Sequence, residues 1–260
     1  MKKFKQYIVW AVTALVLSAG AAMAADRPVK VAIEGNFPPF NYVDTKGTPL
    51  GFEVDLVKEI CRRIGRSCEF TVVDWDGIIP ALLARKIDVV AASMSITEER
   101  KRAVAFTHKY YAETGNFAVV KGSEIKISPD GLREKRVGVQ RATIWGNYVK
   151  NVFPDATIVY YDNVDLGCLD LIARRIDAML GQSLYMNDWL KKPNAKDLVI
   201  AGAPVNDSRY IGEGIGFAMR KSDTELQTRF NKALDAMLAD GTYQKLADRY
   251  FDFDIYGSKE

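Results

Sequence analysis

The stretch SMSITEERKRAVAF, residues 93–106, concentrates hydroxyl and charged side chains in an otherwise ordinary sequence. Ser95 and Glu98 have the S-x-x-E spacing of a capping box, in which the serine accepts a hydrogen bond from a first-turn N–H and the glutamate reaches back. We therefore expect a helix to begin here. The free N–H groups at its N-terminus carry partial positive charge. Arg100, in the first turn, adds a guanidinium that can donate two parallel hydrogen bonds. The pattern predicts a carboxylate-binding site, and a capped surface helix with a solvated arginine is the alternative.

The first 24 residues have the features of a secretory signal peptide. Lysines at positions 2, 3 and 5 precede an apolar run at 8–17, and Ala22-Met23-Ala24 forms a small-x-small cleavage site. We therefore expect residues 1–24 to be removed and the mature protein to be periplasmic. Loss of three lysines lowers Lys+Arg from 36 to 33, which equals Asp+Glu. A mature chain without net charge is not expected to bind nucleic acid.

The cysteines and the single histidine limit the chemistry of the chain. Cys61 and Cys68 are seven residues apart, between a helix expected to end at Gly65 and the following strand, so export favours a disulfide between them. Cys168 lies on the apolar side of a helical pattern and is expected to be a buried free thiol. His108 has no second histidine to form a metal site or a Ser-His or Cys-His system. We expect neither a metal nor a cofactor.

Apolar runs alternate with amphipathic segments along the mature chain, which predicts parallel sheets covered by helices. Strands are expected at residues 29–35, 68–75, 88–93, 135–140, 156–161 and 176–182, with a further extended segment at 116–122. Helices are expected at residues 52–65, 76–87, 142–153, 163–175, 224–241 and 242–251.

A change in this pattern after Phe106 predicts an α/β fold of two lobes. Lobe 1 is expected to contain residues 25–114 plus 215–260, and lobe 2 residues 115–214. The chain then crosses twice, near 113–117 and 213–217, which makes a two-segment hinge. Because open α/β sheets bind ligands at the carboxyl ends of their strands, the cleft between the lobes is the expected site.

Several motifs together resemble the periplasmic polar amino-acid-binding proteins of ABC importers, solute-binding protein family 3, and in particular the lysine/arginine/ornithine and histidine binders. The similar segments are GFEVDLVKEICRRIG, DWDGIIPALLARKIDVVAASMSITEERKRAVAFT, KRVGVQRAT, RRIDAMLG and DGTYQKLADRYFDFDIYG. They extend over essentially the whole mature chain. The resemblance implies a type II periplasmic-binding-protein fold, a monomer that closes on one small ligand, and delivery of that ligand to an inner-membrane ABC permease.

The resemblance also implies which residues contact the ligand. Arg100 would bind the α-carboxylate, aided by the first-turn N–H groups at Thr143 and Ile144. Further contacts are implied at Ala92, Ser93 and Ser95.

At the other end of the ligand, the basic amino-acid binders place an acid after the first strand and aromatic residues around the ligand side chain. Glu34 stands at the acid position, and Phe37 and Trp75 at the aromatic ones. A planar guanidinium can lie between aromatic faces while a carboxylate neutralises it. For the two aromatic residues, simple core packing is the alternative.

Two departures from the family pattern concern the ligand. The strand that usually ends in an aspartate for the α-ammonium here reads DAMLGQ, which leaves neutral Gln182 at that position, and Arg141 adds a cation near the expected carboxylate site. Both suit an opine such as octopine or nopaline, in which the α-nitrogen is substituted and a second carboxylate is present. For Arg141, a side chain that points into solvent is the alternative. An enzyme on the same scaffold, similar to the periplasmic cyclohexadienyl or arogenate dehydratases, is the alternative function.

Overall fold

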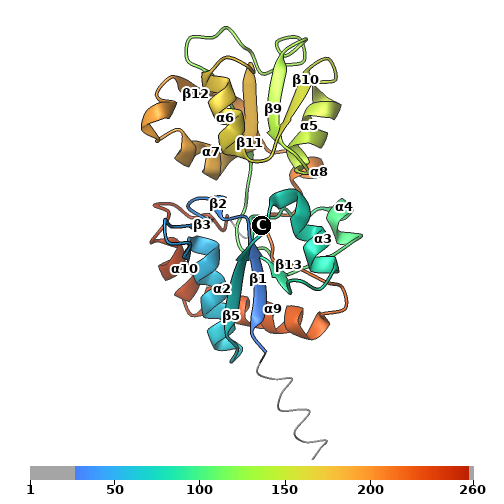
Figure 1. Cartoon of the computed structure of the whole chain (residues 1–260), viewed down its shortest axis with the longest axis vertical. Helices are drawn as coiled ribbons and strands as arrows, with labels where there is room; N and C mark the ends of the chain where they lie inside the picture. The colour runs from blue at the N-terminus through green and yellow to red at the C-terminus, as the bar shows by residue number, and fades with distance from the viewer. Residues whose placement is uncertain (1–26, 258–260) are drawn as a thin grey trace, which may run out of the picture.

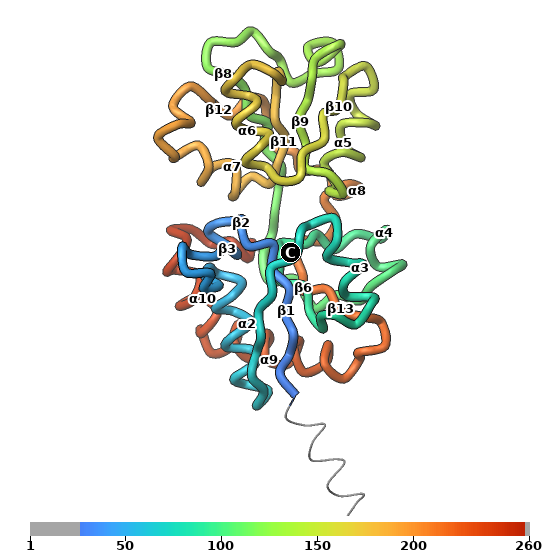
Figure 2. The backbone as a smooth tube through the Cα atoms, in the orientation of Figure 1, coloured from blue at the N-terminus to red at the C-terminus, as the bar shows by residue number. Residues whose placement is uncertain are grey.

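The computed structural model describes residues 27–257, so the predicted signal peptide at 1–24 lies outside the described residues. Two halves lie one above the other along the long axis of the molecule (Figure 1), and each is built on one five-stranded sheet. We call the half with the first sheet lobe 1 and the half with the second sheet lobe 2. The tube view follows the chain from lobe 1 into lobe 2 and back (Figure 2).

The lobe 1 sheet combines parallel and antiparallel strands. In spatial order it contains β5 (Cys68–Val72), β1 (Val29–Ile33), β6 (Val89–Val90), β13 (Ala218–Met219) and β7 (Ala105–Phe106). β1 pairs in parallel with β5 and β6, whereas β13 runs antiparallel to β6 and β7. A small antiparallel sheet of β2 (Asn36–Phe37), β3 (Asn41–Val43) and β4 (Pro49–Leu50) follows β1.

The helices of lobe 1 pack around this sheet (Figure 1). They are α2 (Phe52–Arg63), α3 (Ile78–Leu83), α4 (Glu98–Lys101), α9 (Thr224–Ala239) and α10 (Thr242–Ala247), with a 3₁₀ turn at Trp75–Gly77. In α2, the apolar residues Phe52, Leu56 and Ile60 recur at helical spacing and are fully buried. Acidic residues in its first turn and basic residues in its last turn complement the helix dipole.

Lobe 2 has the same mixed arrangement. Its sheet contains, in spatial order, β10 (Thr157–Tyr161), β9 (Arg136–Gln140), β11 (Ala178–Gln182), β8 (Gly115–Val120) and β12 (Leu198–Val205). β9 pairs in parallel with β10 and β11, and β8 runs antiparallel to β11 and β12. Its helices are α5 (Ile144–Val152), α6 (Val164–Ile172), α7 (Ser183–Trp189) and α8 (Ser208–Ile211), with a 3₁₀ turn at Pro193–Ala195.

The expectation of two α/β lobes is confirmed, but the expectation of parallel sheets is wrong for part of each sheet. The strand–helix–strand units give parallel neighbours, as predicted. The antiparallel strands β8 and β13 directly follow the two crossings between lobes, so the chain enters each sheet from the opposite direction. The sequence pattern predicts no strand or helix for the segments that form β12 and α7.

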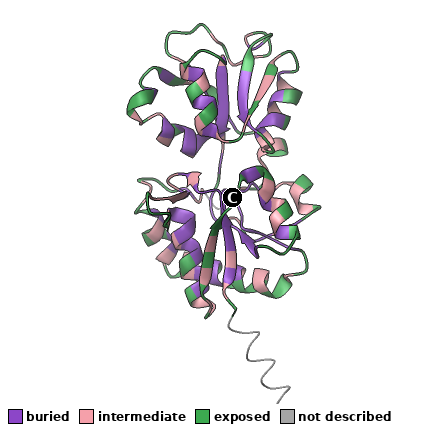
Figure 3. Cartoon of the chain, in the orientation of Figure 1, coloured by how far each residue is buried: buried purple, intermediate pink, exposed green. Residues whose placement is uncertain are grey.

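Each lobe has its own apolar interior (Figure 3), and both sheets are largely buried at their centres. The core of lobe 1 includes the fully buried Phe52, Tyr110 and Phe217, and that of lobe 2 includes Phe117 and Trp189. Tyr110 and Phe217 stack with ring centroids 4.2 Å apart, next to the segments that cross between the lobes. The apolar cores thus fix in place the ends of the strands that face the other lobe.

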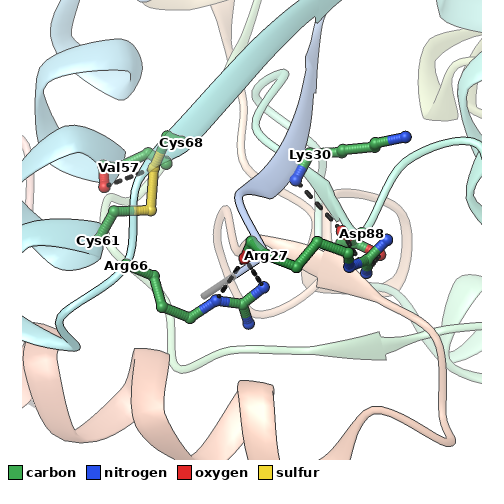
Figure 4. Close-up of a disulfide and its surroundings, with 7 residues drawn as sticks. All are labelled: Arg27, Lys30, Val57, Cys61, Arg66, Cys68 and Asp88. Atoms are coloured by element: carbon green, nitrogen blue, oxygen red, sulfur yellow. Dashed lines mark hydrogen bonds and ion pairs between the residues drawn. A yellow bond between two sulfur atoms is a disulfide. The ribbon is translucent and has the colours of Figure 1, made fainter. Parts of the chain in front are cut away.

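The disulfide between Cys61 and Cys68 is present (Figure 4), and it joins the end of α2 to the start of β5. Cys168 on α6 is buried and free, as expected. Burial raises the pKa of its thiol to about 12, so it is protonated and unreactive at neutral pH.

Alkylation should distinguish the three cysteines. When mature protein is denatured without reduction, one label is expected, at Cys168, and prior reduction should raise the number to three. Intact mass measures both. Three labels without reduction would contradict the disulfide.

Candidate functional site

A cavity lies between the two lobes. Part of its lining comes from the carboxyl ends of parallel strands: Glu34 follows β1, Ser93 follows β6, and Gln140 and Gln182 end β9 and β11. This is the position expected for ligands of open α/β sheets. The full lining is Glu34, Phe37, Trp75, Ala92, Ser93, Ser95, Arg100, Gln140, Thr143, Ile144, Trp145, Val164 and Gln182.

The structure brings the predicted site residues together around this cavity, with the exception of Arg141. Arg141 lies outside the lining, and its guanidinium forms an ion pair with Asp162 at 2.8 Å, with both side chains largely exposed. The preceding residue, Gln140, is buried and lines the cavity instead. Gln140 is the last residue of β9, whereas Arg141 lies in the turn that follows, so only one of this pair reaches the cavity.

Three lining residues were missed: Gln140, Trp145 and Val164. Gln140 could have been found, because it ends a predicted strand of lobe 2 just as Gln182 does. Trp145 and Val164 open the helices α5 and α6, and nothing in their spacing separates them from ordinary core residues.

Arg100 is the one basic residue among the lining residues that the structure describes, and it forms no salt bridge within residues 27–257. Its Nη1 donates to the carbonyl oxygen of Ser95 at 3.1 Å. The guanidinium lies over the ring of Trp75, 5.2 Å from the centroid. Burial lowers the pKa of Arg100 to about 10, so the side chain remains charged at neutral pH. A partly desolvated cation without a counter-ion is a binding site for an anionic group.

The predicted capping box at Ser95 is wrong by two residues. The N-cap of α4 is Thr97, whose Oγ1 accepts a hydrogen bond from the backbone N–H of Arg100 at 3.2 Å. Ser95 instead forms an isolated antiparallel bridge with Ile215, so its backbone is extended. The helix has only four residues, and Arg100 therefore points back toward the cavity from its single turn.

Other groups near Arg100 also lack protein partners. Within residues 27–257, the hydroxyl of Ser93 is buried and has no hydrogen-bond partner. Thr143 is the N-cap residue of α5, but its hydroxyl donates to the carbonyl of Gln140 at 2.7 Å and does not cap the helix. The first-turn N–H groups of α5 thus have no side-chain cap at the cavity wall. Free N–H groups, a hydroxyl and a guanidinium are the donors that bind a carboxylate.

Glu34 is the one acidic residue among the described lining residues, and it is 8% exposed. Burial raises the pKa of its carboxyl to about 7, although a hydrogen bond from Gln140 acts in the opposite direction. Gln140 Nε2 donates to Glu34 Oε1 across the two lobes at 2.6 Å. Phe37 and Trp75 form the nearby wall, and Phe37 also stacks on Tyr185 of lobe 2 at 4.1 Å.

Gln182 also bridges the lobes, because its Nε2 donates to the carbonyl oxygen of Ser93 at 3.0 Å. Trp75 makes a similar contact, from its Nε1 to the carbonyl oxygen of Ala142 at 3.1 Å. The lobes are therefore in contact around the cavity through the same residues that line it. Charge in the lining is limited to one cation and one anion, Arg100 and Glu34.

Comparison with known proteins identifies the family: residues 29–253 match the bacterial extracellular solute-binding proteins, family 3, and the chain belongs to this family. It is 39% identical to the L-arginine-binding protein of Pseudomonas aeruginosa over 90% of this chain and 92% of that protein. It is also 39% identical to the lysine/arginine/ornithine-binding periplasmic protein of Escherichia coli, over 94% of this chain and 95% of that protein.

A solved structure of an ancestral arginine-binding protein bound to arginine has a TM-score of 0.80 and 37% sequence identity, over 86% of this chain and 98% of that chain. The fold is that of the type II periplasmic binding proteins, as the resemblance implied. Within residues 27–257, no helix has the length and apolar character to cross a membrane, and no group of three metal-ligating side chains was found.

The buried carboxyl of Glu34 predicts a pH-dependent stability. Between its ordinary pKa of 4.5 and about 7, the folded protein binds a proton at Glu34 that the unfolded chain releases. The free energy of unfolding of ligand-free protein should therefore fall as pH rises through this window. Urea unfolding from pH 4.5 to pH 7 should show a shallower decline for Glu34→Gln, by up to about 3 kcal/mol over the window. Equal slopes for both proteins would contradict the buried position.

Proposed function

We propose that this protein is the periplasmic solute-binding component of an ABC importer and that it binds a basic amino acid in the cavity between the lobes. Membership of solute-binding protein family 3 supports the class of protein. The names of its relatives, which bind arginine, lysine, ornithine or histidine, support the class of ligand. The relatives are named as binding proteins, which favours binding over the dehydratase alternative.

The observation that carries the proposal is the pair of unlike charges in the cavity lining. Arg100 has no carboxylate partner within residues 27–257, and Glu34 is held only by an amide. A ligand with a carboxylate at one end and a cation at the other would neutralise both. In the proposed orientation, the α-carboxylate lies on Arg100, the Ser93 hydroxyl and the N-terminus of α5. The side-chain cation then extends between Phe37 and Trp75 to Glu34.

The position of Gln182 bears on the choice between a free amino acid and an opine. A neutral amide accepts a hydrogen bond from an α-nitrogen without neutralising an ammonium, which suits a substituted nitrogen. However, the second carboxylate of octopine or nopaline would need a second cation, and Arg141 is paired with Asp162 outside the lining. The geometry therefore favours a ligand with one carboxylate, such as arginine, and keeps the opine as the alternative.

We propose further that the lobes contain residues 25–114 plus 215–260 and residues 115–214, and that they move about crossings near 113–117 and 213–217. An isolated bridge between Tyr111 and Ile215 supports this division, because it pairs the two crossing segments beside the cavity. Closure on the ligand would bring the lobe surfaces together for an inner-membrane permease. That partner is implied by the family.

Substitution of Arg100 tests the carboxylate site. Arg100→Ala should weaken arginine binding by about 2 to 5 kcal/mol, because truncation of a buried charged donor leaves the carboxylate unpaired. Arg100→Lys should restore little, since an ammonium lacks the planar fork. Isothermal titration calorimetry measures the affinity, and far-UV circular dichroism controls for folding. Unchanged affinity in a folded Arg100→Ala variant would overturn the proposed site.

Substitution of Gln182 tests how the α-nitrogen is recognised. Gln182→Asp should shift the ratio of affinities toward free arginine and away from octopine, because the new carboxylate attracts an ammonium and repels the second carboxylate of the opine. Titration of wild type and variant with both ligands gives the ratio. Arg141→Ala is the matched control and should leave both affinities within about threefold, as expected for an exposed ion pair. An unchanged ratio in Gln182→Asp would place position 182 outside the contacts to the ligand.

A further inference from the structure

A buried carboxylate lies behind the cavity and is not part of its lining. Glu53, in the first turn of α2, has no exposed surface. It receives three hydrogen bonds: from the backbone N–H of Ser93 at 2.7 Å, from Asn41 Nδ2 at 2.6 Å and from the hydroxyl of Tyr110. The backbone N–H of Ser93 and the amide of Asn41 each supply a hydrogen, and each carboxylate oxygen of Glu53 accepts at least one hydrogen bond. A buried carboxylate with three hydrogen-bond donors is held in one position and holds its partners in place.

The partners of Glu53 lead directly to two segments of the site. Asn41, also fully buried, accepts hydrogen bonds at its Oδ1 from the backbone N–H groups of Glu34 and Gly35, at 2.9 and 3.1 Å. Glu53 therefore fixes the end of β1 through Asn41 and the end of β6 through Ser93. These two strand ends carry the acid and the unpaired hydroxyl of the cavity.

The backbone conformation at Ser93 makes this support important. Ser93 has φ of 51°, in the left-handed region that a residue other than glycine adopts only when its surroundings hold it there. The N–H of this residue is bound by Glu53, and its carbonyl oxygen receives the interlobe hydrogen bond from Gln182. Loss of the Glu53 bond would therefore affect both the hydroxyl and the contact between lobes.

The third donor connects the same carboxylate to the crossing segments. Tyr110 immediately precedes the first crossing, and its backbone N–H donates to the carbonyl oxygen of Ile215 in the second crossing at 2.8 Å. Its ring stacks on Phe217. Glu53 thus contacts the end of β6 and the Tyr110 segment directly and connects to the end of β1 through Asn41.

We propose that Glu53 is a positioning residue for ligand binding: it holds the Glu34 and Ser93 segments in the geometry that grips the two ends of the ligand. The ligand part of this inference rests on the proposed function. Glu53 does not touch the ligand, so its effect on affinity acts through the backbone of Ser93 and through Asn41.

An isosteric substitution separates this role from simple volume filling. In Glu53→Gln, an NH₂ group replaces one oxygen and faces a donor, either Asn41 Nδ2 or the N–H of Ser93. If Asn41 flips to accept from it, its oxygen leaves the N–H groups of Glu34 and Gly35. Every orientation breaks the bonds to one strand end. The double variant Glu53→Gln with Asn41→Asp restores the pattern, because an aspartate accepts from the new amide and from both N–H groups.

The matched control is Asp88→Asn. Asp88 is a second buried acid, 3% exposed, which directly precedes the same strand β6 at the end away from the cavity. It pairs with Arg220 at 2.7 Å and with Arg27 at 2.9 Å (Figure 4 shows the Arg27 pair). Its loss should lower the stability of lobe 1 without changing the geometry of Glu34 or Ser93.

Titration with arginine and thermal unfolding of the ligand-free variants test the inference together. Glu53→Gln should lower arginine affinity about tenfold or more, and the double variant should return it to within about threefold of wild type. Asp88→Asn should lower the unfolding temperature while its affinity stays within about threefold. Loss of stability in Glu53→Gln without loss of affinity, or failure of the double variant to restore affinity, would overturn the inference.

Amide hydrogen exchange of the ligand-free protein gives a readout that does not depend on the ligand. In Glu53→Gln, exchange should accelerate at Ser93, or at Glu34 and Gly35, or at all three, and Asp88→Asn should leave these amides protected. Unchanged protection in Glu53→Gln would contradict the positioning role whatever the ligand is. If the wild-type protein fails to bind any basic amino acid while exchange changes as expected, the proposed function fails and the positioning role stands. If Glu53→Gln does not fold, Asn41→Ala removes the link between Glu53 and the Glu34 segment and is measured in the same way: affinity within about threefold of wild type with unchanged exchange at Glu34 and Gly35 would then overturn the inference.

Discussion

The site depends on the half-buried guanidinium of Arg100 and the buried carboxyl of Glu34, which no salt bridge within residues 27–257 neutralises. Burying an ion without a partner is unfavourable, and folded proteins normally pair such groups. Here Arg100 contacts a carbonyl oxygen and an aromatic ring, and Glu34 contacts an amide. Within residues 27–257, neither forms a salt bridge. A ligand with the complementary charges would gain binding free energy by pairing with both groups.

The fold explains how these charges are held apart. Each lobe directs the carboxyl ends of its parallel strands toward the cavity, and these ends supply Glu34, Ser93, Gln140 and Gln182. The lobe 1 groups would otherwise move with the turns that follow their strands. Hydrogen bonds from Ser93 and Asn41 to the buried Glu53 connect those turns to α2 and to the apolar core beneath it. The rigid interior of lobe 1 therefore sets the geometry of its half of the site.

Much of the site could be predicted from the resemblance to the family, and several of its residues also follow strands that the sequence marks clearly. The apolar runs that end at Glu34, Ser93 and Gln182 are short and bounded, so the ends of the strands are easy to locate. In this structure Arg141 lies outside the cavity lining, because it follows β9 in a turn and pairs with Asp162. The sequence places the start of α4 at Ser95, two residues before the observed N-cap Thr97, because both are hydroxyl residues that can cap a helix.

Other features depended on tertiary contacts that no local pattern contains. The antiparallel strands β8 and β13 pair with distant segments, and β12 contains Gly202 and Pro204, which weaken its strand signal. From the sequence alone, Glu53 is expected to be an acidic residue in the first turn of an amphipathic helix. Only the packing of β3, β6 and the Tyr110 segment around it shows that it is buried.

The most direct test of the central claim is a calorimetric comparison of arginine with two analogues that each lack one charged end. Agmatine keeps the guanidinium but has no carboxylate, and citrulline keeps the carboxylate but has a neutral side chain. If Arg100 and Glu34 each need a ligand counter-ion, arginine should bind and both analogues should bind at least about a hundredfold more weakly. Binding of agmatine or citrulline as tight as that of arginine would contradict the account.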